Sequence, residues 1–243
     1  MMLTLAIIGF LLLLLLIGKI NLSIQFHKQV NELFDSSKNI SSKTFHKQQL
    51  ENLPEPVQRY FNHVLKDGEP YISFVSMTHN GQFKTGLNKN WINIKGEQYA
   101  TTEKPGFIWK GTTSIFIARD MYIANKGRLI VSLFSLYNVV DANGEQYNQG
   151  ELLRWLAESV LYPTNLLPSE KLKWIAIDAQ TAKLTFDYNE LSLFFNITFN
   201  ASGEITQLET KRYMDEKNLE TWVIKLANYK AMNNVVVGGV YHW

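Results

Sequence analysis

The sequence predicts a mainly β protein of the α+β class. In it, an N-terminal transmembrane helix precedes a strongly curved antiparallel sheet or half-barrel with an inserted helix. Three observations support this prediction. The first 18 residues carry no charge and only one polar side chain, Thr4. From residue 71 onward the apolar residues recur with a period of two, which is typical of strands. One segment rich in good helix formers, residues 149–161, interrupts these strands.

Residues 1–20 are predicted to form a transmembrane anchor. A helix needs about 20 apolar residues to cross a bilayer, and Lys19 is the only charge in this segment. A cleaved signal peptide is the alternative, but no basic residue precedes the apolar run and no Ala-x-Ala pattern follows it. We therefore favour an uncleaved anchor. Lys19 and Lys28 favour a cytoplasmic domain, yet large domains can translocate despite so small a bias, so the side of the membrane is left open.

The chain after the anchor divides into a connecting segment and one domain. Residues 21–43 are predicted to form a juxtamembrane helix and a polar tether, and the Ser-rich stretch 35–43 is the tether. An apolar stripe at helical spacing would lie along the bilayer surface or dock on the domain: Leu22, Phe26, Val30 and Leu33. Residues 44–243 are enough for a single β-rich domain. The last predicted strand reaches Trp243 without a turn, which suggests a truncated chain.

The elements of the domain follow from caps, turns and alternation. A short helix is expected between Thr44 and Pro54, and Pro56 suits the first turn of a second helix that ends at Gly68. Asn148 is a plausible cap for the inserted helix and Pro163 its end. Turn signals then delimit twelve predicted strands: 71–79, 81–87, 91–101, 107–114, 115–125, 128–140, 171–178, 183–188, 191–199, 204–212, 221–232 and 235–243.

The composition excludes several classes of protein. A formal net charge of +2 provides no strong field for nucleic acid. The chain has no cysteine, and its five histidines show no metal-ligand spacing. There is no Gly-rich phosphate loop and no nucleophile elbow. We therefore expect no metal site, no cofactor and no nucleic-acid partner.

Several motifs carry a resemblance to a known family, and they occur in a consistent order. They are Leu53-Pro54-Glu55-Pro56-Val57-Gln58-Arg59-Tyr60, Pro105-Gly106-Phe107-Ile108-Trp109, Asp120-x-Tyr122, Gly150-Glu151-Leu152-Leu153-Arg154-Trp155-Leu156-Ala157-Glu158, Tyr162-Pro163, Leu166-Leu167-Pro168, Trp174 and Asp178. Together they resemble the uncharacterised bacterial family named domain of unknown function 6544. The resemblance implies a membrane-associated bacterial protein and brings no known reaction. It also implies a C-terminal portion beyond Trp243.

Three charged residues of the inserted helix form the first candidate site. Glu151, Arg154 and Glu158 fall at i, i+3 and i+7, so they share one helix face. A half-buried ion-pair ladder is one interpretation. In another, Arg154 binds a carboxylate or phosphate head group through its planar guanidinium. The two carboxylates are also candidates for acid–base chemistry, which spacing alone does not favour.

Aromatic residues provide the second candidate site. They make up 13% of the chain, which either reflects sheet packing or indicates an apolar cavity. The candidate ligand contacts are the three charged residues above together with Trp109, Tyr122, Trp155 and Trp174.

Three functions remain open. The favoured hypothesis is a non-enzymatic, membrane-anchored protein that binds an apolar or lipid-like ligand, because no catalytic motif is present. Its sheet would resemble those of lipoprotein carriers and lipid-binding envelope proteins, by analogy of fold only. The second is a hydrolase-type enzyme that uses carboxylates, and the third is an envelope protein-interaction module.

Overall fold

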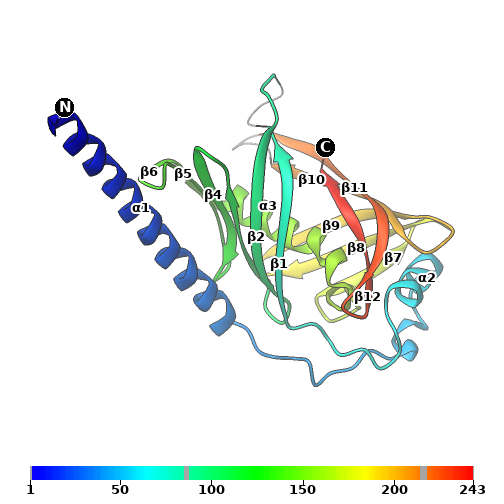
Figure 1. The fold of residues 1–243 in the computed structure, drawn as a ribbon. Coiled ribbons are helices and arrows are strands. Elements are labelled where there is room, and N and C mark those ends of the chain that lie inside the picture. The colour runs from blue at the N-terminus through cyan, green and yellow to red at the C-terminus, as the bar shows by residue number, and fades with distance from the viewer. Residues whose placement is uncertain (1, 85–87, 214–217, 243) are drawn as a thin grey trace. The chain divides into compact units, whose positions relative to one another are not determined.

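The computed structural model describes residues 2–84, 88–213 and 218–242. The protein is mostly β: a long N-terminal helix and two antiparallel six-stranded sheets (Figure 1). The chain divides into two compact units. Unit 1 comprises residues 1–38 and 74–151, and unit 2 comprises residues 39–73 and 152–243.

Unit 1 begins with helix α1 (Met2–Asp35), which runs without a break through the predicted anchor and the predicted juxtamembrane helix. Its first half is exposed and apolar, whereas Gly18, Leu22, Phe26, Val30 and Leu33 are buried. The apolar stripe of the sequence is therefore a docking face, one of the two alternatives open at the sequence level.

Six strands form the first sheet in simple sequence order, each antiparallel to the next. They are β1 (Phe74–Phe83), β2 (Ile92–Thr101), β3 (Gly106–Thr112), β4 (Phe116–Ile123), β5 (Lys126–Leu133) and β6 (Tyr137–Asn143). In such a meander, the turns β1–β2, β3–β4 and β5–β6 lie at one end of the sheet. The turns β2–β3 and β4–β5 lie at the other end.

Helix α1 covers one face of this sheet. Its buried stripe forms an apolar core with side chains of β3, β4 and β5: Phe26, Val30, Leu33, Ile108, Met121, Ile123 and Ile130. The buried Arg119 donates from Nη1 to Gln29 Oε1 of α1 at 3.0 Å. Lys110 places its ammonium 3.9 Å from the centre of the Phe26 ring. Apolar packing and these polar contacts together fix α1 on the sheet.

Unit 2 contains helix α2 (Glu55–Val64), a short 3₁₀ helix η1 (Lys47–Leu50) and the second sheet. Pro56 lies in the first turn of α2, as expected. The strands pair in the order β12-β11-β10-β9-β8-β7. They are β7 (Leu172–Ala176), β8 (Thr181–Tyr188), β9 (Leu191–Phe199), β10 (Ile205–Tyr213), β11 (Leu219–Met232) and β12 (Val235–His242). Tyr60 and Phe61 of α2 pack on Phe199 and Trp174, with ring centroids 6.0 and 6.3 Å apart.

The inserted helix α3 (Glu145–Glu158) begins four residues earlier than predicted and continues as a 3₁₀ turn, η2 (Ser159–Leu161). A second 3₁₀ turn, η3 (Pro163–Leu166), follows it. Asn148 is not the cap of α3. It lies inside the helix, where its Oδ1 accepts a hydrogen bond of 2.7 Å from the backbone N–H of Gly127.

The predicted single sheet is wrong, because the strands form two sheets of six. Each sheet is open in the described part of the chain, so no closed barrel is formed. Two turns also differ from the prediction. Asn80-Gly81 lies inside β1, where ten consecutive residue pairs with β2 outweigh the local turn preference. Conversely, the predicted strand 128–140 is interrupted by a turn at Phe134-Ser135.

Candidate functional site

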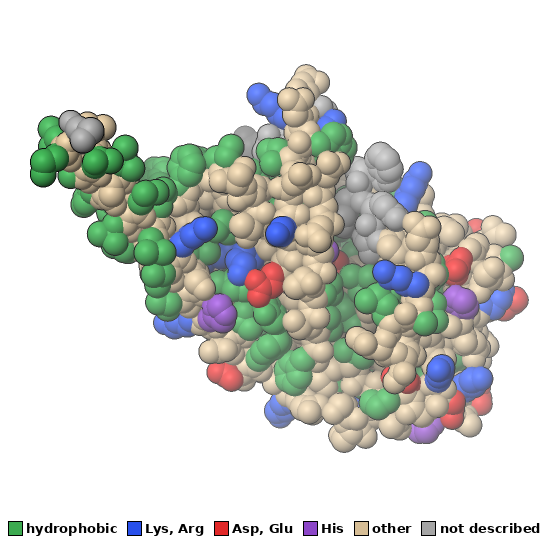
Figure 2. Space-filling model, viewed as in Figure 1, with side chains coloured by type: hydrophobic (Ala, Val, Ile, Leu, Met, Phe, Trp, Pro, Cys, Tyr) green, Lys and Arg blue, Asp and Glu red, His purple; other side chains and the backbone are tan. Residues whose placement is uncertain are grey.

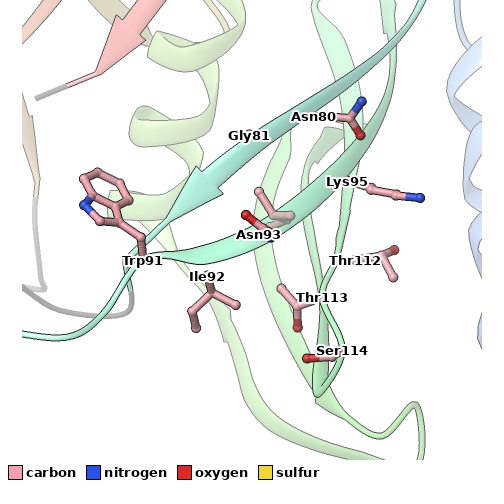
Figure 3. Close-up of a pocket in the computed structure, with 10 residues that line it drawn as sticks. Asn80, Gly81, Trp91, Ile92, Asn93, Lys95, Thr112, Thr113 and Ser114 are labelled. Carbon is pink, nitrogen blue, oxygen red and sulfur yellow. The ribbon is translucent and has the colours of Figure 1, made fainter.

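An open pocket of about 680 Å³ lies in unit 1 at the end of the first sheet (Figure 3). Its walls come from β1, β2 and the β3–β4 turn. The lining residues are Asn80, Gly81, Trp91, Ile92, Asn93, Ile94, Lys95, Thr112, Thr113 and Ser114. The volume falls within the range of about 300–1,000 Å³ that is usual for small-molecule sites.

The pocket lining combines apolar surface with a few polar groups. Trp91 is 61% exposed, and Ile92 and Ile94 extend the apolar wall. Amides and hydroxyls supply the polar atoms, and Lys95 is the only charged residue among the described lining residues. The described lining residues include no carboxylate, so they offer no acid–base pair. They combine an apolar wall with hydroxyls, amides and one ammonium group.

The position of α1 relates this pocket to the apolar N-terminal segment. A Cβ added to Gly18 would lie 2.6 Å from Leu136 Cδ2 and 2.7 Å from the carbonyl oxygen of Ser135, in the β5–β6 turn. Leu33, further along the helix, approaches Gly106 at the opposite end of the sheet. Residues 2–17 therefore extend past the sheet at the end that carries the pocket (Figure 1).

Trp109 is a predicted ligand residue on the same sheet as the pocket. It lies on β3, donates from Nε1 to His79 Nε2 at 2.9 Å and stacks on the His79 ring at 6.2 Å. A Cβ added to Gly111 would meet both the Trp109 ring and Ile94 Cδ1. Gly111 thus lets Trp109 approach the pocket residue Ile94. Tyr122 of β4 is fully buried.

The predicted charged residues lie on α3. Arg154 donates from Nε to Glu158 Oε1 at 2.9 Å, and the two side chains are 16% and 10% exposed. Glu151, which belongs to unit 1, is buried. Burial and the Glu158 charge raise the pKa of the fully buried Tyr162 hydroxyl. The ion-pair interpretation is therefore observed for Arg154 and Glu158, and the head-group role of Arg154 stays a prediction.

The two remaining predicted tryptophans are core residues of unit 2. Trp155 packs on Phe186 with ring centroids 5.5 Å apart, and Trp174 donates from Nε1 to the Leu166 carbonyl at 2.9 Å. Both are more than nine-tenths buried. Any contact of these two side chains with a ligand remains a prediction.

The prediction missed most of the pocket, because its residues meet only through strand pairing. Asn80 lies opposite Lys95, and Lys95 lies opposite Thr112. The available signal was the Trp-Ile-Asn-Ile sequence that opens β2, where an exposed tryptophan follows a polar turn.

The fold and the pocket define a class of protein in which an apolar N-terminal helix is docked on an open antiparallel sheet. The chain belongs to the family of unknown function DUF6544, which matches residues 43–240. A comparison with curated proteins finds no match.

Proposed function

We propose that this protein is a membrane-anchored, non-enzymatic binding protein for an apolar or lipid-like ligand, held in a bacterial membrane by α1. One observation carries the proposal. The pocket on the first sheet opens at the end from which the apolar half of α1 extends. A ligand that partitions into the bilayer would reach this pocket without crossing water.

The anchor is supported by the length and surface of α1. The helix is long and apolar enough to span a membrane, and a signal sequence can have the same length and hydropathy. The side chains of its first half are exposed, among them Leu5, Phe10 and Leu12 at 60% or more. Hydrophobic side chains gather along this half in Figure 2. The continuation of the helix into a buried stripe favours an uncleaved anchor, since a cleaved leader has no need to lead into a docking face.

The pocket chemistry favours a lipid-like ligand. Trp91 and Ile92 would cover an acyl chain or a similar apolar group. Lys95 would contact a polar head through its ammonium, and Thr112 and Ser114 would donate hydroxyl hydrogen bonds. A strongly curved sheet that binds lipid as lipoprotein carriers do is part of this proposal, by analogy of fold alone.

The two other hypotheses have less support. A carboxylate-based hydrolase would need a site elsewhere, because the described lining residues of this pocket include neither aspartate nor glutamate. An interaction module would use the edge strand β6, on which Tyr137, Val139 and Val140 are exposed. The predicted contact of Arg154 with a ligand head group also needs its own test.

Native mass spectrometry with lipid extraction on the full chain in detergent tests the proposal. We expect a stoichiometric lipid or apolar molecule to copurify with the protein and to be lost when Trp91 is changed to Ala. Lys126→Ala, at the opposite end of the sheet, is the matched control and should retain the molecule. Retention by W91A with loss in a folded Arg154→Ala variant would move the site to α3. Absence of any bound molecule from the unaltered protein would refute the proposal.

A further inference from the structure

Exposed apolar side chains gather at the pocket end of the first sheet, in two neighbouring turns. Ile115 of the β3–β4 turn is 51% exposed. In the β5–β6 turn, Phe134 and Leu136 are 53% and 52% exposed, and Tyr137, the first residue of β6, is 71% exposed. The backbone N–H of Phe134 donates to the Ile115 carbonyl at 2.9 Å, so the two turns are adjacent. We call these four residues the apolar rim.

The rim lies beside the point where α1 leaves the sheet. Gly18 packs directly against Leu136 and Ser135, and the hydrophobic surface of α1 continues onto the neighbouring hairpin (Figure 2). Lys19, the first charged residue of the chain, follows immediately. The rim therefore adjoins the apolar segment of α1 at the C-terminal end of that segment, just before Lys19.

The length of that segment sets the depth of the rim. Residues 2–18 of α1 span about 26 Å, at about 1.5 Å per residue. The hydrocarbon core of a bilayer is about 30 Å thick, with head-group regions on either side. A helix that crosses this core has Gly18 at or just inside its boundary. The rim, which touches Gly18, then reaches the same boundary.

The backbone of the β5–β6 turn offers a second argument. Phe134 and Ser135 both have positive φ, 49° and 62°, and are the central residues of a β-turn that the Leu136 N–H closes by donating to the Leu133 carbonyl at 3.0 Å. The other described turns with two consecutive positive φ values each contain asparagine: Ala124-Asn125, Asn189-Glu190 and Asn233-Asn234. Asparagine tolerates this conformation, whereas a bulky phenylalanine is disfavoured there. Phe134 occupies this position although its side chain is 53% exposed.

We propose that the apolar rim inserts into the membrane interface beside α1 and forms a second contact of the first sheet with lipid. Phe134 and Leu136 would lie at the acyl boundary, with Tyr137 at the level of the head groups, where aromatic side chains are enriched. Lys19 would reach anionic lipid phosphates. This inference rests on the proposed anchoring by α1. With two membrane contacts instead of one, α1 and the sheet docked on it cannot turn together about the helix axis, and the pocket mouth stays at the membrane surface.

Single-cysteine labelling of the full chain tests the rim, because the native sequence has no cysteine. Three variants carry an environment-sensitive fluorophore in phosphatidylcholine–phosphatidylglycerol vesicles: Leu11→Cys, Phe134→Cys and Asn125→Cys. Leu11 lies in the apolar half of α1, and Asn125 lies in the β4–β5 turn at the other end of the sheet. Nitroxide-labelled lipids then report the depth of each label.

The expected result is deep quenching at position 11, shallow quenching at position 134 and none at position 125. Quenching at 11 without quenching at 134 would overturn the rim contact and leave the anchor intact. No quenching at 11 would refute the anchor itself. A blue-shifted label at 134 that lipid nitroxides do not reach would assign the rim to a protein contact and overturn the inference.

A second variant separates rim contact from general proximity to the membrane. Phe134→Asn combined with Leu136→Ser suits the turn backbone and removes the apolar surface. A label at Ile115→Cys should then lose at least half of its quenching by shallow nitroxides. The label at position 11 should be unaffected. Unchanged quenching at position 115 would show that the rim side chains do not hold the sheet at the membrane.

Discussion

At the scale of single residues, Glu97 shows how charge helps to hold α1 on the first sheet. Its carboxylate accepts hydrogen bonds from Lys110 Nζ at 2.6 Å and from the Tyr99 hydroxyl at 2.8 Å. Burial raises the pKa of Glu97, but the hydrogen bonds from Lys110 and Tyr99 and the Lys110 charge outweigh it, so the pKa is lowered. Lys110 also covers the Phe26 ring of α1. The carboxylate therefore positions the cation that contacts the helix.

Changing Glu97 to Gln should destabilise unit 1 in a pH-dependent way. A carboxyl group with a lowered folded-state pKa adds stability above its ordinary value of 4.5. That stability is lost as the pH falls through the folded-state pKa. We expect about 1 kcal/mol of destabilisation at pH 7, because the pair is partly exposed, and no difference at a pH below the lowered pKa. Hydrogen exchange of the β2 and β3 amides at the two pH values measures this destabilisation. Glu32→Gln, on the exposed surface of α1, is the control and should have a smaller effect. An equal effect of the control, or an effect of Glu97→Gln that is the same at both pH values, would contradict a stabilising role of the Glu97 carboxylate.

Gly203, in the turn between β9 and β10, is a second residue with a definite physical role. Its φ is +84°, and an added Cβ would lie 2.8 Å from the Arg59 carbonyl oxygen of α2. Gly203→Ala should therefore cost about 2 kcal/mol or more of unit 2 stability. Gly68→Ala is the control, since Gly68 has φ +83° and nothing within 4 Å of an added Cβ. Chemical denaturation of both variants gives the difference. Equal costs would show that the close approach of α2 is unimportant.

At the scale of elements, α1 has an exposed apolar half and a half that is buried against the first sheet. Phe26 is fully buried in the contact with the first sheet, whereas Ile24 is 63% exposed on the same helix. Phe26→Ala should weaken docking of α1 by about 3–5 kcal/mol through the lost apolar contact and the cavity left behind. Ile24→Ala should change it by less than about 0.5 kcal/mol. Proteolysis rates of the 18–35 segment compare the two variants. Similar protection in both would argue that α1 is held chiefly by the membrane.

The elements that depend on local chemistry were predictable from the sequence. The predicted strand 191–199 coincides with β9, because alternation and flanking turn residues define both of its ends. The β5–β6 turn was missed because Phe134-Ser135 contains none of the residues, Asn, Asp or Gly, that usually adopt positive φ in such a turn. Division into two sheets was missed for a different reason. Alternation shows which residues share a face, but it does not show which strand pairs with which.

The candidate site was less predictable than the fold. Trp155 and Trp174 fill the core of unit 2, whereas Trp91 stands exposed at the pocket. Sequence alone treats these tryptophans alike, since burial depends on which strand face another element covers. Arg154 and Glu158 were correctly placed on one helix face because the period of a helix is fixed.

At the scale of the whole molecule, an uncleaved anchor makes α1 a permanent part of the protein. Intact mass spectrometry of these 243 residues, expressed as a chain and purified from membranes, should then give their full mass of 28.0 kDa. A smaller mass with a new N-terminus between residues 18 and 24 would identify a cleaved leader. Such cleavage would leave the Phe26–Leu33 stripe to dock without a membrane helix.

Two charges in the apolar half of α1 separate anchoring from folding. Leu11 and Leu12 are 54% and 61% exposed and lie near the middle of the apolar half. Changing both to Arg should cost about 5–7 kcal/mol of membrane insertion, from about 2.5–3.5 kcal/mol for each charge. The variant should therefore leave the membrane fraction, while Leu11→Ala with Leu12→Ala should remain in it. Unit 1 should keep its fold, because these side chains contribute little to the core. Circular dichroism of the released protein checks this. Loss of sheet structure on release would mean that the membrane is part of the folding environment of unit 1, and that its pocket exists only at the bilayer.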